Sequence, residues 1–494
     1  MNGSRRWWAL GALVICLLTL GLDGTILNVA LPTLATEIGA GTSGLQWIVD
    51  AYILVFAGLL LPMGALGDRL GRKRVLLAGL AFFLVSSIGA AYVSGVGALI
   101  AARALMGLGS AIMTPMAMAI LPVLFAPAER ARAISVMAAA MGIGVPLGPI
   151  VGGFLLDHFW WGSIFLVNVP VAVIGMIASA LLVPESRDPR SRPVDWLGGL
   201  LSTAGLVLGV YGVIEAPRRG WSSEQVLVPL VAGLALLAVF VVWERRCPYP
   251  MIDLGLFGRP RFLWGTVAAT VGTFGLFGLL FTMPQYFQAV QGADALETGV
   301  RLLPMMGGLV LGAGGADRIV ARIGTKIPVA VGLLVIASAL AVGATTQLGT
   351  SYGFAAGWLA TVGFGVGLSL APSMDAVLGE LPPDQSGSGT ALTMTLRQVG
   401  GALGIALLGS VLVSAFASRY SGPGSESVSA AVVAAAHSPA LLVQAQAAYV
   451  HGMDVVLLVC AGLCLLCAAM VAVALPARPA ERGAESRHDL ARAA

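Results

Sequence analysis

Apolar runs of roughly twenty residues recur along the chain from Trp8 to Leu475. Each run is long enough to cross the ~30 Å hydrocarbon core of a bilayer as an α-helix. The composition agrees with this interpretation, because 58% of the 494 residues are hydrophobic and 65 are glycine. Small residues of this kind allow membrane helices to approach one another closely. The sequence therefore predicts an all-α integral membrane protein rather than a soluble one.

We predict fourteen membrane-spanning helices. They cover residues 8–29, 44–63, 75–92, 97–116, 133–156, 164–183, 196–214, 226–243, 262–286, 296–315, 327–346, 353–378, 389–414 and 453–475.

The distribution of basic residues predicts how the chain sits in the membrane. When the loops are numbered from a cytoplasmic N-terminus, most of the 28 lysines and arginines fall on the cytoplasmic side. The outside loops hold only Arg218, Arg219 and Arg419. This bias follows the positive-inside rule and predicts a multi-pass protein of the cell (plasma) membrane with both termini in the cytoplasm. The net charge of +4 thus reflects topology, and we expect no nucleic-acid partner.

The densest run of charge is the short turn between the second and third spans, GALGDRLGRKR at residues 64–74. A related segment, GGADRIVARIGTK at residues 314–326, follows the tenth span and repeats the Asp68-Arg69 pair as Asp317-Arg318. We therefore interpret spans one to six and spans nine to fourteen as two related six-helix halves. Such a parallel repeat is found in many transporters. We interpret the two segments as related cytoplasmic hinges of a protein that moves between two states.

This repeat predicts a four-part organisation. Residues 1–192 form an N-terminal six-helix half, and residues 193–258 form two extra linker helices that face lipid. Residues 259–477 form a C-terminal six-helix half, which includes a long outside loop at 419–451, and residues 478–494 form a cytoplasmic tail. The outside loop is rich in serine, alanine and glycine, so we expect it to be mobile.

Two carboxylates fall inside predicted spans, Asp23 in the first and Asp50 in the second. Intramembrane acids are costly, so the default interpretation is a functional residue that faces a cavity. The alternative is a buried carboxylate that only holds two helices together. Arg103 is the one charge of the fourth span. At 1.5 Å per residue all three side chains lie about 9 Å from the outer ends of their spans, so we expect them at a similar depth.

Arginine stays protonated in proteins, so Arg103 cannot itself carry a proton across the membrane. It can keep a neighbouring carboxylate ionised, and its withdrawal would favour protonation of that carboxylate in a desolvated site. This chemistry suits a proton-coupled switch. In the second half, Arg397 is the only charge at mid-depth, and we expect it to act in substrate binding or gating.

The fifth span contains the glycine- and proline-rich stretch GIGVPLGPIVGG at residues 142–153. Proline removes helix hydrogen bonds, while glycine permits a bend and close packing. We expect a conformational role for this stretch, and its candidate residues are Gly144, Pro146, Gly148, Pro149, Gly152 and Gly153.

Two further observations concern the outer ends of spans. The sequence MPQYFQ at the end of the ninth span includes Gln285, which either lines a cavity or marks the membrane interface. Gln285 and Tyr52 complete the candidate substrate-binding residues, together with Asp50, Asp23 and Arg397. Glu297 and Arg301 are four residues apart, and we predict a helical i,i+4 ion pair at the outer surface.

Several kinds of chemistry lack support in the sequence. The phosphate-binding pattern GxxxxGK[ST] is absent, so ATP-driven transport by this chain is not expected. The four histidines have no ligand-like spacing, and Cys464 and Cys467 fall inside an apolar span, where packing is the expected role. We therefore expect no catalytic residues, no cofactor and no metal site.

Several motifs resemble those of the major facilitator superfamily, and specifically its fourteen-helix drug:proton antiporter branch. They are LDGTILNVALP in the first span, GALGDRLGRKR after the second, LIAARALMGLGSA in the fourth and GIGVPLGPIVGG in the fifth. FLVNVP, MIDLGLFGRPRF and MPQYFQAVQG also look like this branch, so the resemblance covers nearly the whole chain. Two residues depart from the family pattern: Met106 replaces a glutamine usual three residues after the arginine, and Ser135 replaces a glycine expected before Gly144.

The resemblance implies roles for individual residues. Asp23 and Arg103 would serve proton coupling, and Asp50 sits where some multidrug members carry an acid associated with cationic drugs. The segment after the second span would form a cytoplasmic gate, and the fifth-span motif resembles the one that separates exporters from uptake members. The candidate gating residues are Gly64, Gly67, Asp68, Arg69, Gly71, Arg72, Lys73, Asp317 and Arg318.

These features predict a proton-coupled antiporter that exports amphipathic, mainly cationic drugs or dyes by alternating access. Its partners would be small-molecule substrates, protons and the lipid bilayer, and we expect a monomer. The nearest alternative is a dedicated exporter of one self-made antibiotic or metabolite. An uptake symporter uses the same fold, and a membrane-embedded enzyme or non-transporting receptor is the alternative of a different class.

Overall fold

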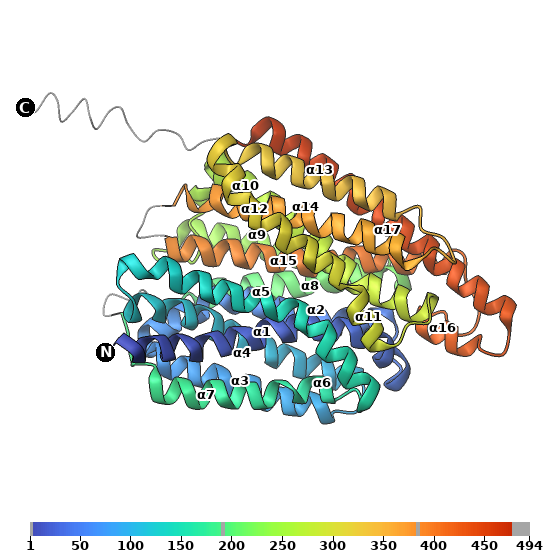
Figure 1. The fold of residues 1–494 in the computed structure, drawn as a ribbon, viewed down its shortest axis with the longest axis horizontal. Helices are drawn as coiled ribbons and strands as arrows, with labels where there is room; N and C mark the ends of the chain where they lie inside the picture. The colour runs from blue at the N-terminus through green and yellow to red at the C-terminus, as the bar shows by residue number, and fades with distance from the viewer. Residues whose placement is uncertain (1–2, 189–192, 382–385, 477–494) are drawn as a thin grey trace, which may run out of the picture.

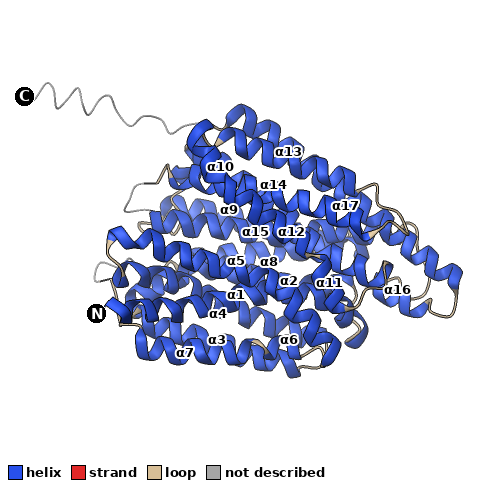
Figure 2. Ribbon diagram, viewed as in Figure 1, coloured by secondary structure: helices blue, strands red, loops and turns tan. Residues whose placement is uncertain are grey.

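The computed structural model describes residues 3–188, 193–381 and 386–476. Within these ranges every regular element is helical and no strand is present (Figures 1 and 2). Fourteen helical segments are long and apolar enough to cross a membrane. The prediction of an all-α membrane protein with fourteen spans is therefore confirmed.

The elements follow one another along the chain with short connections. They are α1 (Gly3–Glu37), α2 (Thr42–Leu70), α3 (Arg72–Tyr92), α4 (Val96–Leu124), α5 (Pro127–His158), α6 (Ser163–Leu166), α7 (Asn168–Leu182), α8 (Trp196–Arg219), α9 (Glu224–Arg246), the 3₁₀ helix η1 (Leu254–Gly258), α10 (Pro260–Gln285), the π-helical turn η2 (Tyr286–Val290), α11 (Ala295–Arg301), α12 (Leu303–Ile323), α13 (Lys326–Gly343), α14 (Tyr352–Leu378), α15 (Ser386–Ala417), α16 (Val428–Ala434) and α17 (Pro439–Ala474).

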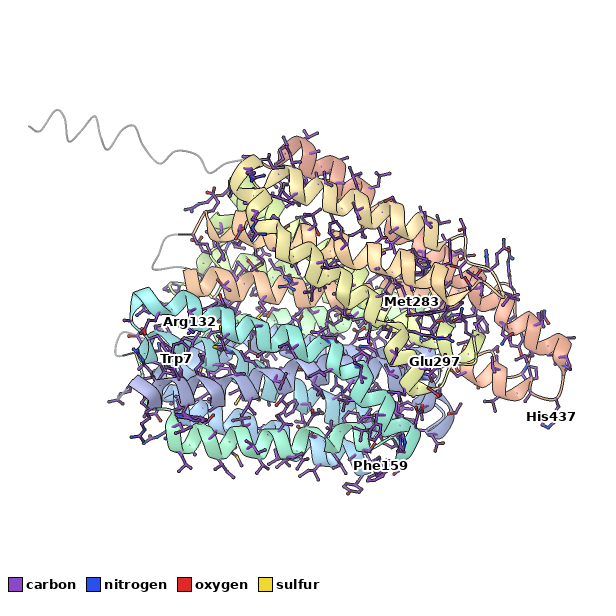
Figure 3. The ribbon with its side chains drawn as sticks, viewed as in Figure 1. Trp7, Arg132, Phe159, Met283, Glu297 and His437 are labelled. Carbon is purple, nitrogen blue, oxygen red and sulfur yellow. The ribbon has the colours of Figure 1, made fainter. Side chains whose placement is uncertain are left out.

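The long helices lie side by side, so the bundle has two ends (Figure 1). The Gly71 end carries the start of α1 and the turn between α2 and α3. The α11 end carries α6, α11 and α16 (Figure 1). Figure 3 shows the labelled Trp7 and Arg132 at the first end, and Phe159, Glu297 and His437 towards the second. The Arg132 guanidinium lies 5.1 Å from the centre of the Trp7 ring.

Packing divides the long helices into two groups and a hairpin. α1 packs on α5 and α7, while α2 and α3 pack on α4. In the second group α14 packs on α12 and α13, and α10 packs on α15. α8 and α9 pair with each other, and α8 also contacts α2 and α15, one helix from each group. The boundary that we place at residue 192 lies outside the described residues, as does the tail at 478–494.

Two large apolar cores correspond to these groups. The first is built mainly from α1 to α5 and also includes Phe281, Ala402, Ile405 and Ala406 from the second group. The second is built mainly from α10 to α17. Apolar residues also cover the outside of the bundle, as on α9, where Val231 and Leu234 are exposed. An apolar exterior is expected of helices that face lipid rather than water.

The segment at 419–451, predicted as a long outside loop, is largely helical. It contains α16 and the first turns of α17, which begins at Pro439 rather than near residue 453. Proline suits the first turn of a helix because its missing N–H would have no partner there. The polar side chains of this extension bond to the end of α10 and to η2: Gln446 donates to the Ala289 carbonyl at 3.1 Å and Tyr449 to the Thr282 carbonyl at 2.8 Å.

Candidate functional site

A buried ion pair joins α1 to α4. Arg103 Nη1 lies 2.9 Å from Asp23 Oδ2, and the two residues are 1% and 0% exposed. Removing two charges from water carries a large penalty, which is offset only when the geometry is good and further hydrogen bonds satisfy the remaining atoms. The structure thus brings together the acid of the first span and the arginine of the fourth, which the depth estimate placed at the same level.

The other oxygen of the aspartate is held by α7. Asn168 Nδ2 donates to Asp23 Oδ1 at 2.9 Å and also lies 3.3 Å from Ser87 Oγ, which itself donates to the Phe165 carbonyl. Asn168 begins α7 directly after a one-residue break that separates α6 from α7. Asn168 was not among the site residues predicted from the sequence. The available signal was a polar side chain inside the apolar run FLVNVP.

Aromatic, sulfur and hydroxyl groups surround the arginine. Its guanidinium lies 4.3 Å from the centre of the Tyr52 ring, a cation–π contact, and its Nε donates to the Ile48 carbonyl at 3.3 Å. Tyr52 and Ser110 share a hydrogen bond of 2.9 Å between their hydroxyl oxygens. Met106, which stands where the family usually has glutamine, places its sulfur 3.9 Å from Arg103 Nη1. The arginine is therefore held by groups on α1 and α2 and by Met106 of its own helix, α4.

Asp50 does not join this network. It is 0% exposed, yet neither carboxylate oxygen has a hydrogen-bond partner within the described residues. Gln46 lies one turn earlier on the same face of α2, and its amide donates to the Ile405 and Ala406 carbonyls of α15 at 2.9 and 3.0 Å. Asp50 therefore lies on the side of α2 that faces α15. Depth along a helix does not separate Asp50 from Asp23, and Gln46 was not among the predicted site residues.

The two candidate residues of the second group lie in different places. Arg397 is half-buried on α15, and its Nε lies 3.3 Å from Thr273 Oγ1 of α10. Gln285 is buried at the end of α10, where its amide donates to the Phe281 carbonyl of its own helix. A small pocket at the α11 end is lined by Gln285 and by Thr42, Leu412, Val413, Phe416, Ser425, Glu426, Val428 and Tyr449.

Two faces of α5 pack closely on other helices, one on α1 and the other, near the end of α5, on α11. α5 runs unbroken through Pro146 and Pro149. An added Cβ at Gly148 would lie 2.8 Å from the Leu22 carbonyl oxygen of α1, and one at Gly144 or Gly152 would lie 3.0 Å from the carbonyl oxygen of Leu18 or Ile26.

The other face carries Pro149, Gly153 and Asp157 and meets α11. A Cβ at Gly153 would lie 2.5 Å from Leu296 Cα, and one at Gly299 would collide with the Pro149 carbonyl. Asp157 then accepts hydrogen bonds from the Ala295 and Leu296 backbone N–H groups, at 3.2 and 2.9 Å. This close approach needs glycine, because any Cβ would separate the helices.

Other contacts between the two groups lie at the same end. The Thr42 N–H and hydroxyl both donate to the Glu426 carbonyl at 3.0 Å, and Gln288 donates to the Val29 carbonyl at 2.9 Å. The predicted pair of Glu297 and Arg301 also lies here and is confirmed, with 2.6 Å between charged atoms.

The Gly71 turn is anchored to the last turn of α7 and to the chain that follows it. Gly71 alone connects α2 to α3, with φ +115°, a conformation that residues with a side chain rarely adopt. Asp68 and Arg72 form an ion pair of 2.7 Å across the turn. The Arg72 N–H donates to the Ser186 carbonyl at 2.8 Å, and Lys73 Nζ donates to the Ala180 carbonyl at 2.6 Å.

The other candidate gating residues of the segment at 64–74 do not take part in these contacts. Gly64 and Gly67 face Pro115 and Met116 of α4, and Arg69 is exposed.

The related segment at 314–326 repeats the local backbone of the Gly71 turn. Gly324 ends α12 with φ +78°, and its N–H bonds back to the Val320 carbonyl at 2.8 Å, as the N–H of Gly71 bonds back to the Gly67 carbonyl at 3.0 Å. Arg318 is exposed on α12. The side chain of Asp317 lies outside the described part of the structure.

The chemistry available here is that of charges and hydrogen bonds. Within the described residues no group of three or more histidine, cysteine, aspartate or glutamate side chains could hold a metal ion. The site instead has one satisfied carboxylate beside an arginine, Asp23 on α1, and one unsatisfied carboxylate, Asp50 on α2.

A bundle of fourteen apolar helices with an ion pair enclosed between them is the architecture of a membrane transporter. The chain belongs to the Major Facilitator Superfamily, whose sequence model matches residues 13–405. The structure is also similar to that of a bacterial homologue of the human lysosomal transporter Spinster, in an inward-facing and unoccupied conformation. The TM-score is 0.68 with 16% identity, over 97% of this chain and 100% of the other.

Relatives within the superfamily are named for drug resistance and export. The chain is 34% identical to the multidrug efflux pump LfrA of Mycolicibacterium smegmatis, over 95% of this chain and 96% of LfrA. It is 32% identical to the tetracenomycin C resistance and export protein of Streptomyces glaucescens, over 83% of this chain and 77% of the relative. It is 34% identical to the methyl viologen resistance protein SmvA of Salmonella typhimurium, over 83% of each chain.

Proposed function

We propose that this protein is a proton-coupled antiporter that exports amphipathic, mainly cationic drugs or dyes from the cell. Its relatives support export of toxic compounds, because they are named as efflux pumps and resistance proteins. The observation that carries proton coupling is the enclosed pair of Asp23 and Arg103, with Asn168 on the second carboxylate oxygen. A carboxylate with a fixed cation beside it can exchange that cation for a proton.

The proposed orientation places the Gly71 end in the cytoplasm, with both termini on that side. The distribution of lysine and arginine in the sequence supports it. The hydrogen bonds described above between the two helix groups lie at the α11 end, which would then be the outer end. With that end closed, the protein would receive its substrate from the cytoplasm or the inner leaflet.

Asp23 and Asp50 have different roles in the proposed transport cycle. A proton arriving from outside would protonate Asp23 and free Arg103 from its counter-charge, which would favour rearrangement of α1 against α4. Asp50 would meet the cationic part of the substrate, because a buried carboxylate without a partner is stabilised by any cation that reaches it. Protons would then enter the cell as substrate leaves it.

A dedicated exporter of one self-made antibiotic or metabolite is the second candidate. It is supported by two relatives named for single compounds, the tetracenomycin C protein and the probable actinorhodin transporter of Streptomyces coelicolor, which is 31% identical over 84% of this chain and 74% of that relative. A panel of chemically diverse substrates separates the candidates, because a dedicated exporter moves one compound and a multidrug pump moves many.

The test uses inverted membrane vesicles with an imposed pH gradient. Wild-type protein should accumulate ethidium, and an uncoupler should abolish the accumulation. Asp23→Asn should lose the dependence on the gradient, and Asp50→Asn should lose most transport of cationic dyes. The proposal is wrong if both variants pump ethidium at the wild-type rate with unchanged sensitivity to the uncoupler. Uptake in the opposite direction would instead indicate a symporter.

A further inference from the structure

A groove of about 590 Å³ lies near the tip of the hairpin formed by α8 and α9. Polar side chains line it beside the turn between the helices, and apolar side chains line it further along them. The lining residues are Leu208, Tyr211 and Arg219 of α8 and Glu224, Gln225, Val228 and Pro229 of α9. Leu208 lies about 16 Å from Arg219 along α8. This order, polar at one end and apolar along the rest, matches the head group and acyl chain of a lipid.

Contacts of α8 place the tip of the hairpin at the α11 end of the bundle. The Tyr211 ring lies 5.9 Å from the ring of Trp47, near the start of α2, and Ser410 of α15 donates to the Val213 carbonyl at 2.8 Å. Trp221 is exposed in the turn itself, and exposed tryptophan is typical of the membrane interface. The polar end of the groove therefore lies at the level of the lipid head groups, and α8 contacts both helix groups beside it.

The turn carries a cluster with an unmatched positive charge. Arg218 Nη2 and Arg219 Nε both donate to Glu215 Oε2, at 3.0 and 2.6 Å. Two arginines thus share one buried carboxylate, so the cluster of Glu215, Arg218 and Arg219 carries a net charge of +1. Arg219 Nη1 donates to Gln225 Oε1. Arg219 Nη2 and the Gln225 amide nitrogen have no hydrogen-bond partner in the described part of the chain, so both can donate to a phosphate.

An unpaired negative charge stands next to this cluster. Glu224 directly precedes Gln225, lines the same groove and is exposed. No basic side chain among the described residues forms an ion pair with it. The polar end of the groove thus presents a cation and an anion side by side, which complements a zwitterionic head group. A primary ammonium can donate hydrogen bonds to the Glu224 carboxylate, whereas a quaternary ammonium has no N–H to donate.

We propose that this groove, the hairpin groove, binds one phospholipid with a phosphoethanolamine head group from the leaflet at the α11 end. The phosphate accepts hydrogen bonds from Arg219 and Gln225, and the ammonium donates to Glu224. An acyl chain lies along Leu208 and Val228. The head group then joins α8 to α9 across the turn, beside the contacts of α8 with both helix groups. This site does not depend on which compound the protein transports.

The experiment is native mass spectrometry of the full-length protein in detergent. Phosphatidylethanolamine, phosphatidylcholine and phosphatidylglycerol with identical acyl chains are added separately, and the affinity for the first bound lipid is measured. Wild-type protein should bind phosphatidylethanolamine about tenfold more tightly than phosphatidylcholine, because the latter forfeits a charge-assisted hydrogen bond to Glu224. It should also prefer phosphatidylethanolamine to phosphatidylglycerol, whose head group brings no cation to that carboxylate.

Substitutions separate the two parts of the head group. Glu224→Gln should bind phosphatidylethanolamine and phosphatidylcholine equally, while Arg219→Gln should weaken binding of all three lipids. In Arg219→Gln the buried carboxylate of Glu215 keeps Arg218 as its partner, so the fold retains that ion pair. Arg219→Lys keeps the charge and should stay within a few-fold of wild type. The matched control is Arg246→Gln, which removes an exposed arginine at the opposite end of α9.

The pattern of affinities decides the outcome. Equal affinity of wild-type protein for the three lipids, or unchanged affinities in Glu224→Gln and Arg219→Gln, would mean annular lipid only and would overturn the inference. A preference for phosphatidylglycerol would also overturn it. A dimer in the same spectra that Arg219→Gln and Glu224→Gln abolish would show instead that a second copy of the chain covers the groove. None of these results bears on export or proton coupling, which the vesicle assay tests separately.

Discussion

Replacing Gly153 with alanine should weaken the contact that closes the α11 end. The added Cβ would lie 2.5 Å from Leu296 Cα and 2.7 Å from the Ala295 carbonyl carbon, whereas ordinary van der Waals contact begins at 3.4 Å. Clearing Leu296 Cα alone would therefore require α5 and α11 to separate by 0.9 Å, which is 3.4 minus 2.5, and the Ala295 carbonyl oxygen lies closer still. Both partners are backbone atoms, so no side chain can turn aside to make room.

The size of the effect follows from the cost of overpacking. Inserting a methyl group into a closely packed contact costs about 1–3 kcal/mol. Alanine favours the helix over glycine by about 1 kcal/mol, but α5 remains helical in either state, so this gain does not alter the equilibrium between states. The ratio of closed to open molecules at the α11 end should fall by about 5- to 150-fold.

The measurement is a distance distribution between spin labels on the two helix groups. Phe159 and His437 are both exposed and lie towards the α11 end (Figure 3), so each can be replaced by a labelled cysteine. Cys247, the one free cysteine that is not buried, is changed to serine first. Gly153→Ala should move the distribution to longer distances.

A matched control lies on the same helix. A Cβ added at Gly142 would meet no atom of another described element within 4 Å, so Gly142→Ala adds the same methyl group to α5 without a collision. Identical distance distributions for the Gly142 and Gly153 variants would refute the reasoning. They would mean that the α5–α11 contact does not hold this end closed.

Three further predictions concern stability and can be checked by thermal or denaturant unfolding in detergent. Arg103→Gln leaves a buried carboxylate without its cation and should lower the free energy of unfolding by about 3–5 kcal/mol. Asn168→Ala removes a hydrogen bond to that carboxylate and should cost about 1.5–3 kcal/mol; an unchanged melting temperature would contradict the geometry. Gly71→Ala, at φ +115° with a carboxylate oxygen 2.7 Å from the new Cβ, should cost more than Gly95→Ala, at φ +97° in open space. Equal costs would show that backbone strain alone matters at Gly71.

Much of the architecture was predictable because membrane helices are defined by local properties. A span needs a length and a hydrophobicity, and both can be read from about twenty consecutive residues. The pair of Glu297 and Arg301 was predictable for the same reason, since residues four apart on one helix are neighbours. The extent of α17 was not, because its first turns carry polar side chains such as Gln446 and Tyr449, whose partners lie on η2 and α10.

The two intramembrane acids show where sequence reasoning stops. The sequence by itself determined that Asp23 and Asp50 lie inside the membrane at a similar depth, because depth follows from counting residues along a helix. Only the tertiary structure decided that Asp23 pairs with Arg103 while Asp50 faces α15. The direction in which a side chain points depends on how its helix is rotated against its neighbours. That rotation is set by packing contacts between residues far apart in the chain, which no local pattern records.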